Sequence, residues 1–201
     1  MRIKGTSISS FLSFLGTEFG ASKTKEFIAS LDPDLRKRAE GPILASDFYP
    51  VEELESLAGR AREHFAEGPG FFERSGSHNA FFGLTGVHQS LLAQPTPLDF
   101  LKAAERSWSQ FVDSGAVSAD VVGDGRVRLK IEGIQGSELL CARETGFLTR
   151  SLSLAGAQQV AVAKARCTQN GDLWCEWSVA WDAASSPQSQ AYTSVIRRPG
   201  V

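Results

Sequence analysis

Apolar residues recur at helical spacing through the first 115 positions. Over 51–65 they return every three or four positions, and carboxylates gather in the first turn, where the helix dipole favours anions. Gly41-Pro42 and Pro95-Thr96-Pro97 interrupt the pattern and mark breaks between helices. The spacing therefore predicts a bundle of helices, with apolar stripes over 8–15, 23–31, 34–38, 51–65, 71–87 and 98–112.

The periodicity changes at Gly115 from helical to alternating. Apolar and basic residues alternate over 126–131, which is typical of a strand with one buried and one wet face. Asn170-Gly171 is the strongest short signal of a hairpin turn in the chain. The predicted order is strand, strand, helix, strand, strand, over about 117–121, 126–131, 136–154, 159–167 and 174–181.

These patterns predict an α+β fold in which N-terminal helices pack on a four-stranded antiparallel sheet. We expect one domain over 1–182, with a helical part over 1–115 and a strand-strand-helix-strand-strand part over 116–182. The last residues, 183–201, are rich in Ser, Gln and Pro and lack apolar periodicity. We expect them to form a flexible tail.

Charge and hydropathy exclude some classes of partner. Lys and Arg number 21 against 23 Asp and Glu, so the chain lacks the basic surplus of a nucleic-acid-binding protein. No apolar run is long enough to span a bilayer, and the first residues lack a signal-peptide cleavage pattern. We expect a cytoplasmic protein with no nucleic-acid partner and no membrane span.

The three cysteines, Cys141, Cys167 and Cys175, all lie in the C-terminal third. The first is near the start of a predicted helix, and the other two flank a predicted hairpin tip, so together they could form three corners of a structural zinc site. The alternatives are packing as small buried hydrophobes, or a disulfide across the hairpin, which a reducing compartment disfavours. Candidates for a fourth zinc ligand are Glu144, Asp172 and Glu176.

Aromatic residues are concentrated in the helical part and could line a pocket for a small apolar ligand, although such residues often only fill a core. His64, His78 and His88 lack metal-ligand spacing and are interpreted as structural. The sequence contains no phosphate-binding loop, nucleophile elbow or dinucleotide fingerprint, so no catalytic residue is assigned. The candidate pocket residues are Phe72, Phe81, Phe82, Trp108 and Phe111.

The C-terminal pattern resembles the ending of the 4-vinyl reductase domain, whose superfamily includes TRAPP vesicle-tethering subunits and haem-NO-binding sensors. More narrowly, the chain is similar to a myxobacterial paralogous family of unknown function. The likeness to the 4-vinyl reductase ending rests on 155–160, 165–167, Gly171-Asp172, 175–177 and Trp181. The likeness to the myxobacterial family rests on these residues together with Asp47-Phe48-Tyr49-Pro50, Leu84-Thr85-Gly86-Val87 and 108–115.

The resemblance implies a zinc site. In similar aromatic-sensing domains of bacterial regulators, three cysteines placed like those of this chain bind zinc together with a glutamate three residues before the middle cysteine. That position is Lys164 here, and an ammonium group is a poor zinc ligand. Another residue or water completes the site, or the metal has been lost and the cysteines remain as packing residues. No other cofactor is expected.

The resemblance also implies a function and an oligomeric state. We expect a non-enzymatic regulatory or sensory module, paired as a homodimer, that binds a small apolar ligand and signals through an unidentified protein partner. The alternative is a constitutive, TRAPP-like interaction scaffold without a free pocket. A third reading, an enzyme acting on a hydrophobic substrate, lacks a nucleophile, a base or a cofactor motif to support it.

Overall fold

The computed structural model describes residues 1–182, and the predicted tail over 183–201 lies outside the described residues. The order of elements confirms the α+β class and the predicted strand-strand-helix-strand-strand succession. The helices are α1 (Gly5–Phe19), α2 (Ala21–Ser30), α3 (Pro33–Glu40), α4 (Val51–His64), α5 (Gly70–Leu84), α6 (Pro97–Ser107) and α7 (Glu138–Leu154). The strands are β1 (Arg2–Lys4), β2 (Phe48–Pro50), β3 (Ala116–Gly123), β4 (Arg126–Glu132), β5 (Ala161–Arg166) and β6 (Cys175–Ala180).

Three helices begin at residues whose side chains cap the free backbone N–H groups of the first turn. Asp32 accepts a hydrogen bond from the backbone N–H of Leu35, and Thr96 and Ser137 play the same part for α6 and α7. Proline follows directly after Asp32 and Thr96, where its fixed φ suits the first helical position. The local sequence therefore specifies where these three helices begin.

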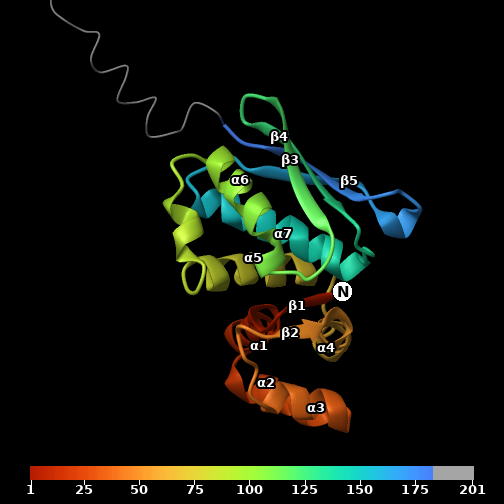
Figure 1. Cartoon of the computed structure of the whole chain (residues 1–201). Coiled ribbons are helices and arrows are strands. Elements are labelled where there is room, and N and C mark those ends of the chain that lie inside the picture. The colour runs from red at the N-terminus through yellow and green to blue at the C-terminus, as the bar shows by residue number, and fades with distance from the viewer. Residues whose placement is uncertain (183–201) are drawn as a thin grey trace, which may run out of the picture.

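The N-terminal helices form one of two hydrophobic cores. Phe11, Phe27, Leu54 and Phe71 are among its most buried members, and they come from α1, α2, α4 and α5. Figure 1 shows α1 to α4 as a lower layer, with α5 and α7 above them and the sheet beyond α7. Helix α5 contributes to both cores, because its first half packs on α1 and its second half reaches the core beneath the sheet.

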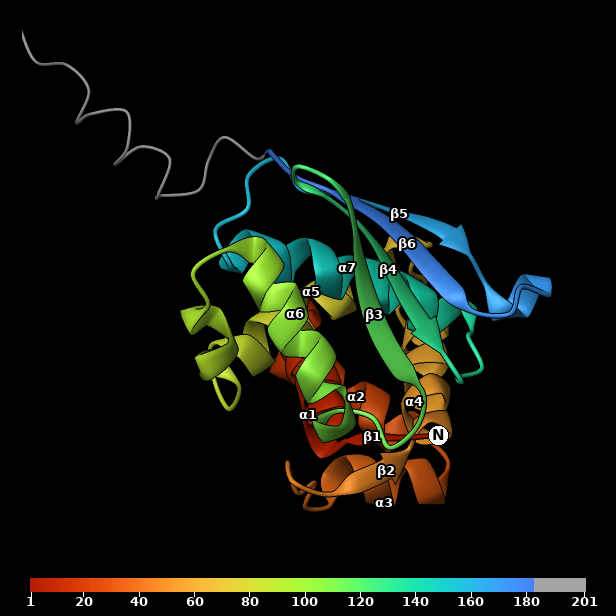
Figure 2. The same ribbon diagram turned by 45° about the horizontal axis from the view of Figure 1, so that its top comes forward.

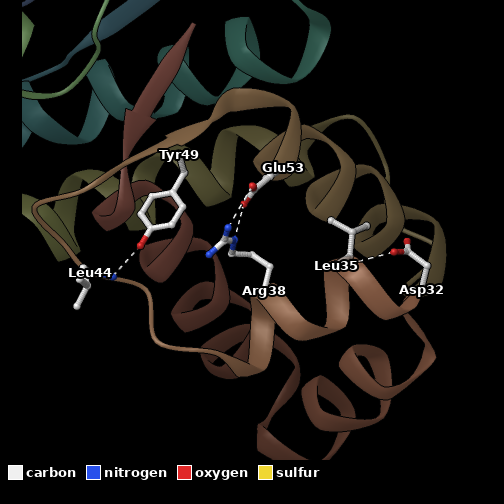
Figure 3. Close-up of polar contacts among 6 residues, drawn as sticks. All are labelled: Asp32, Leu35, Arg38, Leu44, Tyr49 and Glu53. Carbon is white, nitrogen blue, oxygen red and sulfur yellow. Dashed lines mark hydrogen bonds and ion pairs between the residues drawn. The ribbon is translucent and has the colours of Figure 1, made fainter.

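A small strand pair ties the N-terminus to the segment before α4, and the helical periodicity did not predict it. Strands β1 and β2 are antiparallel, with Ile3 opposite Tyr49. The Tyr49 hydroxyl accepts a hydrogen bond from the backbone N–H of Leu44, and the Arg38 guanidinium pairs with Glu53 at 2.6 Å (Figure 3). The region predicted to be purely helical therefore contains two short strands.

The four-stranded sheet has the order β3-β4-β6-β5 and is antiparallel throughout. Val127, Leu129 and Ile131 of β4 are buried, while Arg126 and Arg128 at alternate positions face solvent, which confirms the alternation in the sequence. Figure 2 shows α7 running beneath the sheet and α6 lying beside β3. The second core therefore lies between the sheet and these two helices.

Helix α6 ends earlier than its apolar pattern predicts. It stops at Ser107, and a 3-10 turn over Trp108–Gln110 follows. A 3-10 turn has three residues per turn, so Trp108 and Phe111 still lie on the same, inward side. Strand β1 fixes the residues that follow this turn, because the Lys4 N–H donates to the Phe111 carbonyl and Ile3 forms a β-bridge with Val112.

Helices α5 and α7 cross at two glycines. A Cβ added at Gly76 would lie 1.9 Å from the Arg143 carbonyl oxygen, and one added at Gly146 would lie 1.9 Å from that of Glu73. The two backbones therefore touch where a side chain would otherwise separate them. Within residues 1–182, every helix is too short or too polar to cross a lipid bilayer.

Candidate functional site

A cavity of about 190 Å³ lies between the second core and the edge of the first, bounded by helices α5, α6 and α7, the inner face of the sheet and strand β1. Most of its wall is apolar, which follows from the alternation of β4 and the inward stripe of α6. The apolar wall includes Leu84, Leu91, Phe100, Leu101, Trp108, Phe111, Leu129, Ile131, Phe147 and Leu148.

Some of the aromatic residues predicted to form a pocket lie elsewhere. Trp108 and Phe111 are in the cavity wall. Phe72 is instead buried in the N-terminal core, and Phe81 and Phe82 are 47% and 38% exposed on α5. The assignment of these three phenylalanines to a ligand pocket therefore disagrees with the structure. Apolar residues are spread around α5, so its sequence could not indicate which of them face inward.

Polar side chains in the wall are few. Asn79 accepts a hydrogen bond from Ser10 at 2.6 Å, and Glu105 pairs with Lys102 at 3.0 Å, so both are occupied by protein groups. Besides Cys141 and Cys175, the remaining titratable side chains of the wall are Arg143 and Glu144 of α7 and His88 after α5. Sequence reasoning missed Arg143, because an arginine inside a helix normally indicates a solvated face.

His88 is part of the wall, and its Nε2 atom is buried with no hydrogen-bond partner among residues 1–182. Its ring packs edge-on against Phe111, with 4.6 Å between ring centroids. Burial, followed by the nearby charge of Lys4, lowers the pKa of His88 below its ordinary 6.5. His78 and His64 pack against Phe14 and Phe27, in agreement with a structural role.

The lowered pKa of His88 gives a pH-dependent stability. Below about pH 6.5 the unfolded chain binds more protons at this residue than the folded chain does, so the free energy of unfolding falls as the pH falls. We expect His88→Gln to reduce the loss of stability between pH 7 and pH 5, as measured by urea denaturation at each pH. An unchanged pH dependence in the variant would contradict this expectation.

The three cysteines come together as predicted, at one end of the cavity. The Cys141 sulfur lies 3.5 Å from that of Cys167 and 3.8 Å from that of Cys175, and all three are free thiols. Their Sγ atoms all lie within 4.8 Å of one another. Cys141 and Cys175 also belong to the cavity wall, so the cluster and the cavity are adjacent.

Gly136 makes room for the cysteine cluster. A Cβ at this position would lie 2.7 Å from the Cys175 sulfur and 3.4 Å from that of Cys141. The Gly136 N–H donates to Thr168 Oγ1 at 2.7 Å, which fixes the loop before α7 against the tip of the last hairpin. A glycine just before a capping serine was the sequence signal that could have identified this close approach.

Burial has its largest effect on one of the three thiols, Cys141. It raises the pKa of Cys141 to about 12, and the Lys164 ammonium acts in the opposite direction. Lys164 Nζ lies 3.4 Å from the centre of the Trp177 ring and has no hydrogen-bond partner within residues 1–182. A cation therefore stands beside the cluster at the position where the resemblance places a carboxylate.

Two of the carboxylates considered as a fourth ligand have other partners. Asp172 accepts from the Cys167 N–H at 2.8 Å and pairs with Arg166. Glu176 accepts from the Trp174 indole at 3.0 Å and pairs with Arg128. Among the described residues, the metal-ligand grouping contains the three cysteines alone.

Comparison with solved structures identifies the fold. No family model and no curated protein matches the chain. An H-NOX protein from S. oneidensis in the Fe(II)NO ligation state superposes with a TM-score of 0.71 at 11% identity, covering 90% of this chain and 99% of that one. An oxygen-binding H-NOX domain related to soluble guanylate cyclases gives a TM-score of 0.71 at 12% identity, with coverage of 90% and 95%.

A third structure, from work on haem redox potential and porphyrin distortion, gives a TM-score of 0.69 at 12% identity, with coverage of 89% and 99%. Identities this low carry information about backbone architecture and not about chemistry. The coverage is nearly complete in both directions for all three structures. The chain therefore has the fold of the H-NOX proteins.

Proposed function

We propose that this protein is a non-enzymatic sensory module that binds a small apolar molecule in the cavity beneath the sheet. The observation that carries the proposal is the apolar cavity of about 190 Å³ beside the core under the sheet. An apolar cavity of about 150 Å³ is enough to bind benzene. The ligand class is therefore a molecule of about one ring.

The structural neighbours support a ligand-binding role. One of them is in the Fe(II)NO ligation state and another is an oxygen complex, so the same backbone arrangement holds small molecules in those proteins. In this chain, the cavity wall includes residues of α5, α6, α7 and the sheet. A ligand that fills the cavity would stabilise one packing of these helices on the sheet and so alter a surface read by a partner.

Haem, whose redox potential is modulated in one of the neighbouring proteins, does not fit this cavity. Drug-sized ligands need about 300–1,000 Å³, and a porphyrin is at the large end of that class. The cavity has about 190 Å³, and its wall is filled by Trp108, Phe111 and Phe147. His88 of the wall offers a nitrogen donor, but a cavity of this volume is too small for a macrocycle. The proposed function therefore involves no haem.

A second candidate function is the interaction scaffold. Phe81, Phe82 and Val87 are exposed near the end of α5, and exposed apolar groups favour protein contacts. In that case the cavity stays empty and the protein acts through its surface alone. We propose a homodimer and a protein partner for both functions. No serine or cysteine in the described cavity wall is hydrogen-bonded to a histidine, so no nucleophile-base pair supports an enzyme.

We also propose that the cysteine cluster binds a structural zinc ion that holds the last hairpin against α7. Thiolate sulfurs around tetrahedral zinc, with bonds of about 2.3 Å, lie about 3.8 Å apart. The spacings of 3.5 and 3.8 Å here are close to that value. Three thiolates and Zn²⁺ leave one negative charge, which the neighbouring Lys164 ammonium offsets. Water or another residue would complete the coordination.

Ligand binding can be tested by thermal unfolding in the presence of small apolar molecules such as toluene and indole. At a concentration of about 100 Kd, a ligand of the native state stabilises it by about 2.7 kcal/mol, which raises the Tm by about 5–10 °C for a chain of this size. We expect Ala104→Phe, which places a ring in the cavity, to abolish the increase.

The matched control is Ala161→Phe, which adds the same ring on the exposed side of β5 and should leave the increase intact. Native mass spectrometry of gently purified protein provides a second measurement, since a co-purifying small molecule is expected. If no small apolar molecule raises the Tm and the protein emerges as a ligand-free dimer, the scaffold is favoured and the sensory module is rejected.

A further inference from the structure

Arg143 is a buried cation in the wall of an apolar cavity. Its side chain points from the middle of α7, and the residue is 6% exposed. Burial lowers the pKa of Arg143 to about 10, so the guanidinium is still charged at neutral pH. The position is fixed by the α5–α7 crossing, because the Arg143 carbonyl lies against Gly76.

The guanidinium has one partner within residues 1–182, and that partner is neutral. Nη1 donates to Ser75 Oγ at 3.2 Å, and the Ser75 hydroxyl donates in turn to the Phe72 carbonyl at 2.8 Å. No carboxylate oxygen among the described residues lies within 4.0 Å of the Arg143 nitrogens. A guanidinium has five N–H donors in a planar fork, and Ser75 accepts from one of them.

The nearby charges offset that of Arg143 only in part. Glu144 follows it on the helix and lines the same cavity, but burial raises the pKa of Glu144 to about 7, which leaves part of its population neutral at that pH. His78 feels the charge of Arg143, which helps to lower the pKa of His78. Buried charges are normally paired, because an unpaired one costs several kcal/mol. An unpaired cation at an apolar cavity therefore indicates a missing anion.

We infer that the ligand of this cavity is a small monocarboxylate with an apolar body, held by its carboxylate on Arg143. This inference rests on the proposed function and names its ligand class. The planar guanidinium matches the two oxygens of a carboxylate, and the pair is among the strongest that proteins use in apolar surroundings. The apolar part of the wall, including Leu148 and Phe147, would receive the ring or chain.

The size of the cavity limits the body of the ligand. With about 190 Å³ available, against the roughly 150 Å³ that is enough for benzene, one aromatic ring or a chain of about six carbons fits together with the carboxylate. Longer fatty acids would extend beyond this volume. Benzoate and hexanoate are therefore suitable probes, with benzamide and toluene as neutral molecules of similar shape.

The test measures binding of benzoate, benzamide and toluene by calorimetry to the full chain, to Arg143→Gln and to Arg143→Lys. The native protein is expected to bind benzoate more tightly than benzamide. Arg143→Gln should weaken benzoate by about 10- to 100-fold, the effect of losing charge-assisted hydrogen bonds, and leave toluene unchanged. Arg143→Lys, which keeps the charge but not the fork, should recover part of the affinity for benzoate.

Arg150→Gln is the matched control, because Arg150 is on the same helix but exposed, over the Phe81 ring at 5.5 Å. It should leave benzoate binding unchanged. If toluene binds and benzoate binds no better than benzamide, the carboxylate inference is overturned while the sensory function stands. If neither class binds the native chain, both fail. If Arg143→Gln does not fold, the comparison of benzoate with benzamide in the native protein and in Arg143→Lys decides the question.

Discussion

Gly76→Ala and Gly146→Ala should each abolish most of the stability of the fold. Each added Cβ would lie 1.9 Å from a backbone carbonyl oxygen of the opposite helix, at Arg143 or Glu73, and a backbone atom cannot rotate away as a side chain can. Relief requires α5 and α7 to move apart. We expect a loss of about 4 kcal/mol or more in the free energy of unfolding, a large share of the roughly 5–15 kcal/mol typical of a domain.

The measurement is urea denaturation followed by circular dichroism, with soluble yield as a second readout. Gly16→Ala and Gly59→Ala are matched controls, because these glycines lie within α1 and α4 and a Cβ there meets nothing within 4 Å. Each control should stabilise the protein by about 0.5–1 kcal/mol, the usual gain from replacing a helical glycine with alanine. A Gly76→Ala variant within 1 kcal/mol of the native protein would refute the close crossing.

The crossing also matters for the site. It places the Arg143 carbonyl on the Gly76 backbone, and this contact holds the Arg143 side chain between Ser75 and the cavity. Helix α5 contributes residues to both hydrophobic cores, so a change in its distance from α7 would alter the packing of both. A rigid α5–α7 pair is therefore the element through which occupancy of the cavity could reach the N-terminal helices.

Removal of zinc is expected to have the second large effect. Protein purified without chelator should contain about one zinc per chain by elemental analysis, and Cys167→Ser should lose it. Because the metal would join α7 to the last hairpin, its loss should cost several kcal/mol of stability. A strong chelator should therefore lower the Tm of the native protein and leave that of Cys167→Ser unaffected.

Asp172→Asn is the matched control for zinc. Asp172 accepts from the Cys167 N–H at 2.8 Å, and asparagine keeps an acceptor oxygen at the same turn, so the zinc content should be unchanged. Less than about 0.2 zinc per chain in protein never exposed to chelator would reject the metal centre. The cysteines would then be buried packing residues, and Cys167→Ser would destabilise the protein equally with and without chelator.

Much of the fold could be predicted because its signals are local. The alternation over 126–131 reports which face of β4 is buried, and the capping residues Asp32, Thr96 and Ser137 mark where helices begin. The cysteine cluster was also accessible from sequence. One thiol at a helix start and two beside a hairpin tip meet whenever that helix packs under the hairpin.

The sequence by itself thus determined the helices, the succession of elements from β3 to β6, the four-stranded sheet and the meeting of the three cysteines. Only the tertiary structure decided the β1–β2 pair, the burial of Arg143 and the exposure of Phe81. The physical reason is that periodicity describes one segment at a time. Which side of α5 meets α7, and where Gly76 lets the backbones touch, depend on long-range packing that local spacing does not encode.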